Sequence, residues 1–370
     1  MMEPRKRIGL LFGGRSAEHE VSKLSAANVL RALDPDRYEV VLIGIGRDGR
    51  WLLCDNGNGA GRGAQSLEIP EGSPQVALLP GGHGEMIVLH DSSQAGTLRL
   101  DAVVPVLHGP NGEDGTVQGS LELANIPYVG SGVTGSAASM DKDVAKRLLR
   151  DSGLPVVPYL TLTAGKNLDY RAAVDALGTP DLFIKPANMG SSVGVSRATS
   201  AEEFEKACER AFRYDGKLLV ERSVTGAREI ECSVLEDASG EVRASPLGEI
   251  VPAADHGFYS YDAKYIDAAG ALLRIPADLA PDEADRIRGL AVETFKVLNC
   301  EGLARVDFFV DPKRTDALYV NEVNTLPGFT AISMYPKLWE AGGLPAGALM
   351  EVLIQHAIAR HARRNALALV

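Results

Sequence analysis

Residues 319–328, with the sequence YVNEVNTLPG, say more about the fold than any other part of the chain. The first six are typical of a strand, on which Glu322 and Asn324, two residues apart, point to the same face of a sheet. Acidic residues on one strand usually mark a face exposed to water, so this strand alone indicates little. The Gly turn that follows leaves backbone N–H groups beside that face, where they can stabilise an oxyanion.

A second strand directly upstream changes that interpretation. Residues 304–310 (ARVDFFV) place Arg305 and Asp307 on one face, and the Pro/Asp-rich segment 311–316 is a turn signal. The two strands are therefore predicted to form an antiparallel hairpin, with Asp307 opposite or diagonal to Glu322. Oxygen-bearing side chains and an arginine then converge on one patch of sheet. Such a set is typical of a site that holds Mg²⁺ on the phosphates of a nucleotide.

The bulk composition excludes several classes of protein. The chain has 370 residues, of which 45% are hydrophobic and 24% are charged, so two or three packed units are expected. A net charge of −11 without a long Lys/Arg block argues against a nucleic-acid partner. No apolar run is long enough to span a membrane, and no signal-peptide cleavage site follows the N-terminus. The four cysteines are scattered, which favours free thiols and a cytoplasmic protein.

The pattern of apolar runs predicts three units. Strands at 8–12, 40–45 and 102–107, separated by helical stretches, favour a parallel α/β unit over residues 1–131. Within it, the Gly-rich segment 56–94 is expected to be a surface excursion with at most a short hairpin. Two α+β subdomains are expected to follow: a central one over 132–225, and a C-terminal one over 226–370 that contains the metal hairpin.

Lys185 ends an apolar strand and precedes a loop rich in Gly and Ser, PANMGSSVGV at 186–195. Backbone amides in such a loop can approach an anion closely, and the lysine adds a positive charge. The loop is neither a Walker A sequence nor a G-x-G-x-x-G sequence, so an ordinary mobile turn is the alternative.

The order of these features resembles the ATP-grasp superfamily, in which ATP lies between two α+β subdomains. Within it, the chain resembles the D-alanine–D-alanine ligase family over nearly its whole length. The matching motifs are GGRSAEHEVS at 13–22, HGPNGEDG at 108–115, MDK at 140–142, GSSVG at 190–194, YDAKY at 261–265 and NEVNTLPG at 321–328. Six matches in the family's order are very specific together.

The resemblance implies a site for ATP and magnesium. Lys142 and Lys185 match residues that contact the phosphates of ATP, and Lys264 matches one at the transferred phosphate. The adenine and the ribose are implied to contact Glu221 and Glu229. The resemblance further implies two Mg²⁺ ions, for which Mn²⁺ can substitute. Their ligands are implied to be Asp307, Glu322 and Asn324, and Glu322 is implied to bridge both ions.

The resemblance also implies how two D-alanines are bound. Glu18 matches the residue that binds the ammonium of the first one; without the resemblance, it would only favour the first turn of a helix. Ser191 and Tyr265 match its hydrogen-bonded partners. His108 matches a residue beside the first substrate. Arg305 and the Gly328 amide match groups that face the reacting carboxylate, and Ser333 matches a residue at the carboxylate of the second substrate.

The family's activity implies that ATP-dependent ligation of two D-alanines proceeds through a D-alanyl phosphate, for peptidoglycan synthesis, in a homodimer. A lid is expected over residues 258–269, because water would hydrolyse the acyl phosphate. Two alternatives stay open. A D-alanine–D-lactate ligase is disfavoured by Tyr265, and a non-catalytic ATP-binding regulator would not need Arg305 beside a complete metal set. Other ATP-grasp ligases would not need the Glu18 motif, and an NAD-binding oxidoreductase lacks its Gly-rich fingerprint.

Overall fold

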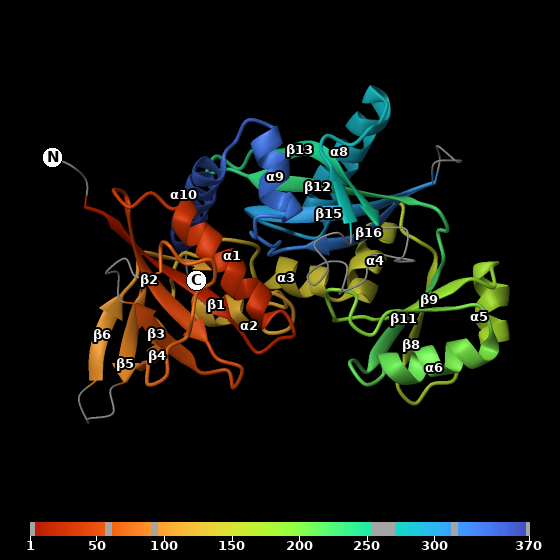
Figure 1. The fold of residues 1–370 in the computed structure, drawn as a ribbon, viewed down its shortest axis with the longest axis horizontal. Helices are drawn as coiled ribbons and strands as arrows, with labels where there is room; N and C mark the ends of the chain where they lie inside the picture. Colours follow the sequence, from red (N-terminus) through yellow and green to blue (C-terminus); the bar gives the residue numbers. More distant parts are fainter. Residues whose placement is uncertain (1–3, 56–60, 90–94, 253–270, 312–316, 368–370) are drawn as a thin grey trace.

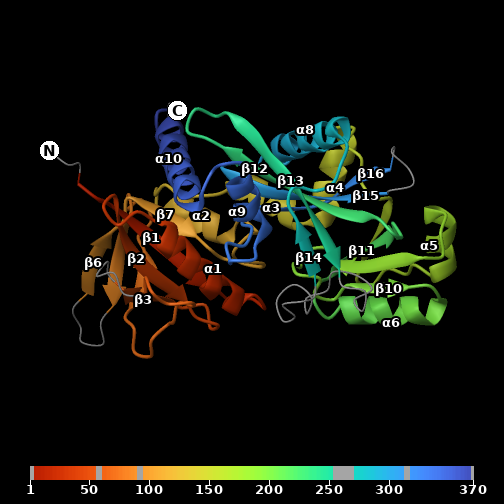
Figure 2. The ribbon, with the colours of Figure 1, turned by 45° about the horizontal axis from the view of Figure 1, so that its top comes forward.

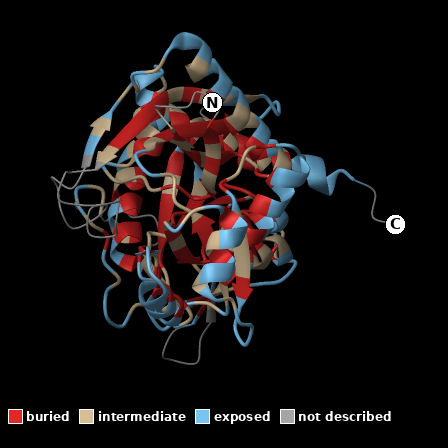
Figure 3. Cartoon of the chain, turned by 90° about the vertical axis from the view of Figure 1, so that its right-hand side faces the viewer, coloured by how far each residue is buried: buried red, intermediate tan, exposed pale blue. Residues whose placement is uncertain are grey.

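The computed structural model describes residues 4–55, 61–89, 95–252, 271–311 and 317–367 (Figure 1). The described residues form three β-sheets, each with its own helices. In Figure 1 the first sheet lies at the left, the second at the lower right, and the third between and above them. Figure 3 shows that buried residues are concentrated inside, with exposed ones on the outer helices and loops.

The first sheet combines a parallel centre with an antiparallel extension, in the order β6-β5-β4-β3-β2-β1-β7. β1 pairs in parallel with β2 and β7, as the α/β pattern predicted, whereas the remaining described pairs are antiparallel. Its strands are β1 (Lys6–Gly13), β2 (Tyr38–Ile45), β3 (Trp51–Asp55), β4 (Gln75–Leu78), β5 (Glu85–Leu89), β6 (Ala95–Arg99) and β7 (Ala102–Pro105). The helices α1 (His19–Ala32) and α2 (Thr116–Leu123) belong to this unit.

The prediction of a surface excursion over 56–94 was wrong in its main point. A short hairpin is present, formed by β4 and β5, but it continues the first sheet between β3 and β6. Val76, Met86 and Val88 are buried in the apolar core on that sheet. The alternation of apolar and polar residues over only four or five positions is too short to distinguish such strands from loop.

The second sheet is small and antiparallel, in the order β10-β9-β11-β8. Its helices α5 and α6 pack on it through an apolar core that includes Phe204, Ile184 and Val220. The elements are β8 (Tyr159–Thr163), α5 (Tyr170–Leu177), β9 (Leu182–Pro186), β10 (Ser196–Ala198), α6 (Ala201–Ala211) and β11 (Lys217–Arg222).

The third sheet has the order β14-β13-β12-β15-β16 and presents two different faces. Alternate residues such as Ile230, Val306 and Phe308 pack under α8 and α4. Because side chains alternate along a strand, the residues between them face the other way. The elements are α3 (Val133–Met140), α4 (Lys142–Asp151), β12 (Arg228–Glu236), β13 (Val242–Pro252), β14 (Ala271–Arg274), α8 (Pro281–Val297), β15 (Leu303–Val310), β16 (Leu318–Asn324) and α9 (Met334–Ala341).

The last helix, α10 (Ala346–Asn365), packs against the first unit (Figures 1 and 2). Leu349, Leu353 and Ile354 share one buried cluster with α1, β1 and β7, and α9 adds Tyr335 and Trp339. The C-terminal part of the chain therefore completes the core of the N-terminal sheet. Within the described residues, no helix combines the length and apolar character needed to cross a membrane.

We predict that Leu353→Ala lowers the free energy of unfolding by about 2–5 kcal/mol, because it opens a cavity in the shared core. The side chain of Leu353 is only 1% exposed, whereas that of Leu123, also helical, is 71% exposed. Leu123→Ala is the matched control and should change stability by less than about 0.5 kcal/mol. Urea unfolding measures both; equal losses would contradict the role assigned to this core.

Candidate active site

The predicted hairpin is confirmed: β15 and β16 are antiparallel, and the register pairs Asp307 directly with Glu322 and Arg305 with Asn324. All four side chains come from the face opposite the apolar core, because the core takes the alternate residues. Residues 312–316 of the connecting turn lie outside the described part of the chain.

Arg305 is the centre of this patch. Its Nε and one terminal nitrogen each donate to a different oxygen of Asp307, both at 2.7 Å. Its Nε also lies 2.9 Å from Oε2 of Glu231 on β12, and Asn324 Nδ2 donates to Asp307 at 3.1 Å. Burial opposes the charge of the guanidinium, but Asp307 and Glu231 outweigh burial and hold the pKa of Arg305 well above its usual value.

The donor types at this patch fit magnesium. Asp307 and Glu322 supply two carboxylates from facing strands, and Asn324 supplies an amide, all ligands that a hard cation prefers. Among the described residues, no group of three or more His, Cys, Asp or Glu side chains is arranged to hold a metal. In a site that holds Mg²⁺ on a nucleotide, phosphate oxygens commonly supply further ligands.

A cavity of about 330 Å³ lies between the second and third sheets. It brings together the predicted nucleotide residues from both sides. From α4 and the second sheet come Lys142, Lys185 and Glu221, and from the third sheet come Glu229, Asp307 and Glu322.

Glu221 is buried in the wall of this cavity, between two lysines. Its two oxygens lie 2.9 Å from Lys146 Nζ and 2.8 Å from Lys185 Nζ. Burial alone would raise the pKa of Glu221, but the two ammonium groups prevail and lower it. Burial lowers the pKa of Lys146 to about 8, although Glu221 opposes that shift. No role was predicted for Lys146 from the sequence. The available signal was its position four residues after Lys142, which places both lysines on one face of the helix.

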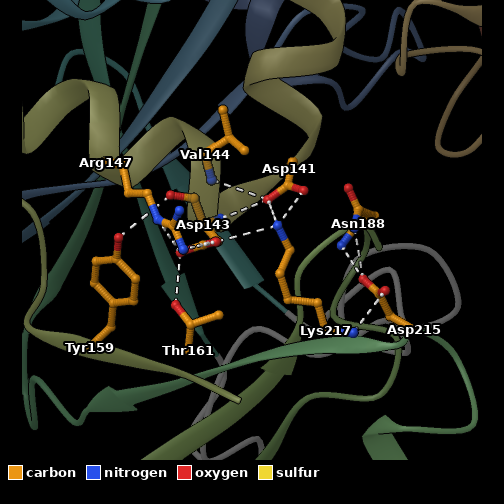
Figure 4. Close-up of polar contacts among 9 residues, drawn as sticks. All are labelled: Asp141, Asp143, Val144, Arg147, Tyr159, Thr161, Asn188, Asp215 and Lys217. Carbon is orange, nitrogen blue, oxygen red and sulfur yellow. Dashed lines mark hydrogen bonds and ion pairs between the residues drawn. The ribbon is translucent and has the colours of Figure 1, made fainter. Parts of the chain in front are cut away.

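The start of α4 is tied to the second sheet by a polar network (Figure 4). The Asp141 side chain caps the helix by accepting from the backbone N–H groups of Asp143 and Val144. Lys217 on β11 donates to both Asp141 oxygens, at 2.6 and 2.7 Å, and Thr161 on β8 donates to Asp143 at 2.7 Å. Because α4 also packs on the third sheet, this network holds both walls of the cavity in one arrangement.

The helix cap places Lys142 at the cavity. Its ammonium donates to the Met189 carbonyl at 2.7 Å and lies 3.7 Å from Glu322 Oε2. Lys142 therefore connects the loop predicted to bind phosphates with the patch that contains Asp307 and Glu322. Ser191 and Ser192 in that loop have left-handed backbones, with φ of +52° and +58°. Such conformations are costly for non-glycine residues and are concentrated at functional sites.

A second cavity of about 100 Å³ adjoins the first, and the two share Glu231 and Glu322. It is lined by six of the predicted substrate residues, which come from segments far apart in the sequence: Glu18, His108, Ser191, Arg305, Gly328 and Ser333. The structure therefore brings together the described residues of the predicted substrate site.

Glu18 is closely surrounded in this cavity. Ser191 Oγ donates to its carboxylate, as the resemblance implied. A Cβ atom added at Gly109 or Gly190 would lie only 3.2 or 3.3 Å from Glu18 Oε2, so both glycines permit backbone close to the carboxylate. The second implied partner, Tyr265, lies outside the described residues, as do Lys264 and the expected lid 258–269, and these stay predictions.

His108 and Ser333 are fixed by local hydrogen bonds. His108 Nδ1 lies 3.0 Å from the Leu326 carbonyl, and burial lowers the pKa of this histidine, which favours the neutral ring. Ser333 Oγ accepts from the Thr330 backbone N–H at 2.9 Å. A Cβ on Gly328 would lie 2.8 Å from the same hydroxyl, so a side chain there would collide with Ser333.

Glu113 also lines the cavity, although no role was predicted for it. Its carboxyl accepts from the backbone N–H of Gly109 at 2.8 Å and of Leu326 at 3.2 Å, joining two loops of the site. Burial, with the nearby Glu18 charge, raises the pKa of Glu113 to about 8. Its place in the HGPNGEDG motif was the only signal in the sequence.

We predict that Glu113→Gln changes how stability depends on pH. The folded chain keeps a proton on Glu113 up to a pKa of about 8, whereas the unfolded chain releases it near its ordinary value of 4.5. Stability therefore falls as pH rises through this window, by up to ~1.4 kcal/mol per pH unit. In urea unfolding, the stability of the variant relative to the wild type should rise from pH 5 to pH 8. A constant difference would contradict the shift, and the exposed Glu71→Gln is the control.

A cavity of about 330 Å³ between two antiparallel sheets, beside a smaller charged cavity, is the arrangement expected of an ATP-grasp ligase. Two family models match, described as "D-ala D-ala ligase N-terminus" over residues 7–131 and "D-ala D-ala ligase C-terminus" over residues 148–355. The chain belongs to the D-alanine–D-alanine ligase family, so the predicted fold and family are confirmed.

Individual relatives agree with this assignment. D-alanine–D-alanine ligase B of Bradyrhizobium diazoefficiens is 63% identical over 99% of this chain and 97% of its own length. The solved D-alanine–D-alanine ligase of Coxiella burnetii is 38% identical, with a TM-score of 0.85 over 98% of this chain and 96% of that one. The VanG D-Ala:D-Ser ligase of Enterococcus faecalis is 33% identical, with a TM-score of 0.82 over 96% of this chain and 100% of that one.

Proposed function

We propose that this enzyme uses ATP to join two D-alanines into D-alanyl-D-alanine, a precursor of peptidoglycan. The observation that carries the proposal is the junction of the two cavities at Glu231 and Glu322, beside Arg305. A phosphoryl group in the larger cavity and a carboxylate in the smaller one would meet there. Reaction at this junction requires no large movement of either substrate.

The chemistry follows from the fact that a carboxylate is a poor electrophile. The carboxylate of the first D-alanine attacks the γ-phosphate of ATP, which gives an acyl phosphate and ADP. Lys142, Lys185 and Arg305 offset the negative charge on the transferring phosphoryl group. The amine of the second D-alanine then attacks the acyl carbon. The tetrahedral oxyanion formed in this attack is stabilised by Arg305 and the Gly328 amide. It then collapses, the bond to phosphate breaks, and the departing phosphate takes up the proton lost by the amine.

Glu18 is proposed to bind the ammonium of the first D-alanine, held in place by Ser191, with His108 beside the same substrate. Ser333 is proposed to bind the carboxylate of the second. At the nucleotide, Glu221 is assigned to the adenine, Glu229 to the ribose and Lys264 to the transferred phosphate. Two magnesium ions, held by Asp307, Glu322 and Asn324, would supply charge neutralisation at the phosphates.

We further propose that the enzyme is a cytoplasmic homodimer. Tyr265 and the segment 258–269 are proposed to close the site against water.

The function is tested by phosphate release from the purified protein with ATP and Mg²⁺. We expect release with D-alanine alone, none with L-alanine, and a dipeptide product by mass spectrometry. Adding D-lactate or D-serine to D-alanine tests the second substrate, because a related structure is a D-Ala:D-Ser ligase. A mixed product in preference to the dipeptide would reassign that specificity. Tight ATP binding without turnover on any substrate would favour a regulator.

Asn324→Ala tests the metal site. Removing one proposed oxygen ligand should raise the Mg²⁺ concentration for half-maximal turnover about tenfold or more, while the melting temperature stays close to that of the wild type. The measurement is initial rate against free Mg²⁺ at saturating ATP and D-alanine. The control is Asn167→Ala, which changes an exposed asparagine that lines neither cavity. An unchanged Mg²⁺ dependence of Asn324→Ala would remove this residue from the metal site.

A further inference from the structure

Glu231 has no role in the proposed reaction, yet it lies in line with Asp307 and Glu322, two of the proposed metal ligands. On β12 it pairs in register with Asp307 on β15, which pairs in register with Glu322 on β16. Three carboxylates therefore lie in one line across three adjacent strands. Glu231 is only 5% exposed, and it is one of the residues that line both cavities. A buried carboxylate in this position needs a physical reason, because its desolvation is costly.

Glu231 forms an ion pair with Arg305. The Arg305 Nε lies 2.9 Å from Glu231 Oε2, while Nε and a terminal nitrogen also donate to Asp307. One guanidinium is thus shared by two carboxylates, Asp307 on its own strand β15 and Glu231 on the neighbouring strand β12. Asp307 is also a proposed ligand of the divalent cation. If Asp307 were the sole anchor of Arg305, a cation at Asp307 and the arginine would compete for the same oxygens.

We infer that Glu231 is a positioning residue. It keeps Arg305 at the junction of the two cavities when Asp307 binds a divalent cation. This inference rests on the proposed function, since it assigns Arg305 to the reacting carboxylate. Glu231 acts through the arginine and touches neither substrate nor metal. Without it, Arg305 relaxes fully onto Asp307, which opposes cation binding and moves the guanidinium from the junction.

The first test compares Glu231→Gln with the wild type. We expect the affinity for Mn²⁺, measured by electron paramagnetic resonance with a non-hydrolysable ATP analogue, to fall about threefold to tenfold. We expect kcat to fall about 10- to 100-fold because Arg305 is misplaced, with the KM for ATP within about twofold. Glu231→Asp keeps the charge and should recover part of kcat. A variant with wild-type Mn²⁺ affinity and kcat would overturn the inference.

A matched control separates this role from a structural one. Glu249 on β13 is equally buried and pairs with Arg228 at 2.7 Å, but it lines neither cavity. Glu249→Gln therefore removes a similar ion pair from the same sheet and should leave Mn²⁺ affinity and kcat unchanged. Equal losses of both quantities in Glu249→Gln and Glu231→Gln would overturn the inference, because they would indicate general damage to the sheet.

A double-mutant cycle tests whether Glu231 acts through Arg305. In an Arg305→Lys background, or Arg305→Met if it folds by circular dichroism, adding Glu231→Gln should change Mn²⁺ affinity by less than about twofold. A full loss in that background would make Glu231 a direct metal ligand and overturn the positioning role. The Mn²⁺ measurement needs no turnover. If the wild type instead shows no D-alanine-dependent phosphate release, the proposed function fails while this measurement still reports on Glu231.

Discussion

The pair between Arg305 and Asp307 is the interaction on which both cavities depend. A largely buried guanidinium is tolerated only because carboxylates compensate its lost hydration, and Asp307 does so by accepting two parallel hydrogen bonds. The same pair fixes the face of β15 that carries charge, while Val306 and Phe308 fill the core on the other face. A shift of this strand by one residue would exchange these faces and bury the charges in the core.

The second constraint is the position of α4 between two sheets. Ala145 and Leu149 pack in the core of the third sheet, while Asp141 is ion-paired to Lys217 of the second. Lys146, one turn after Lys142, reaches the buried Glu221. One short helix therefore joins apolar packing on one side to charge pairing on the other. This arrangement positions Lys142 at the larger cavity and Lys146 behind it, against Glu221 of the cavity wall, without placing either on a loop, which favours precise geometry.

Much of the site could be predicted because its residues stand at short, periodic spacings. The Arg305-x-Asp307 and Glu322-x-Asn324 pairs required only the period of a strand and one turn signal. Glu231 follows the same period on β12, but nothing in the sequence indicates which strand lies beside β15. Pairing between β12 and β15 spans some seventy residues of chain, so it is set by tertiary packing and has no local signal.

The charges in the smaller cavity define what the first substrate must carry. Glu18 and Arg305 both line it, from opposite ends of the chain, so an anionic and a cationic side chain lie together within about 100 Å³, with Glu231 and Glu322 at the side shared with the larger cavity. An amino acid in its zwitterionic form can satisfy both, whereas a hydroxy acid would leave Glu18 without a cation from the ligand. On this ground D-lactate fits only as the second substrate. The proposed contact of Ser333 with the second carboxylate is separate from this charge pair, so the selection of the second substrate can change without altering the proposed binding of the first.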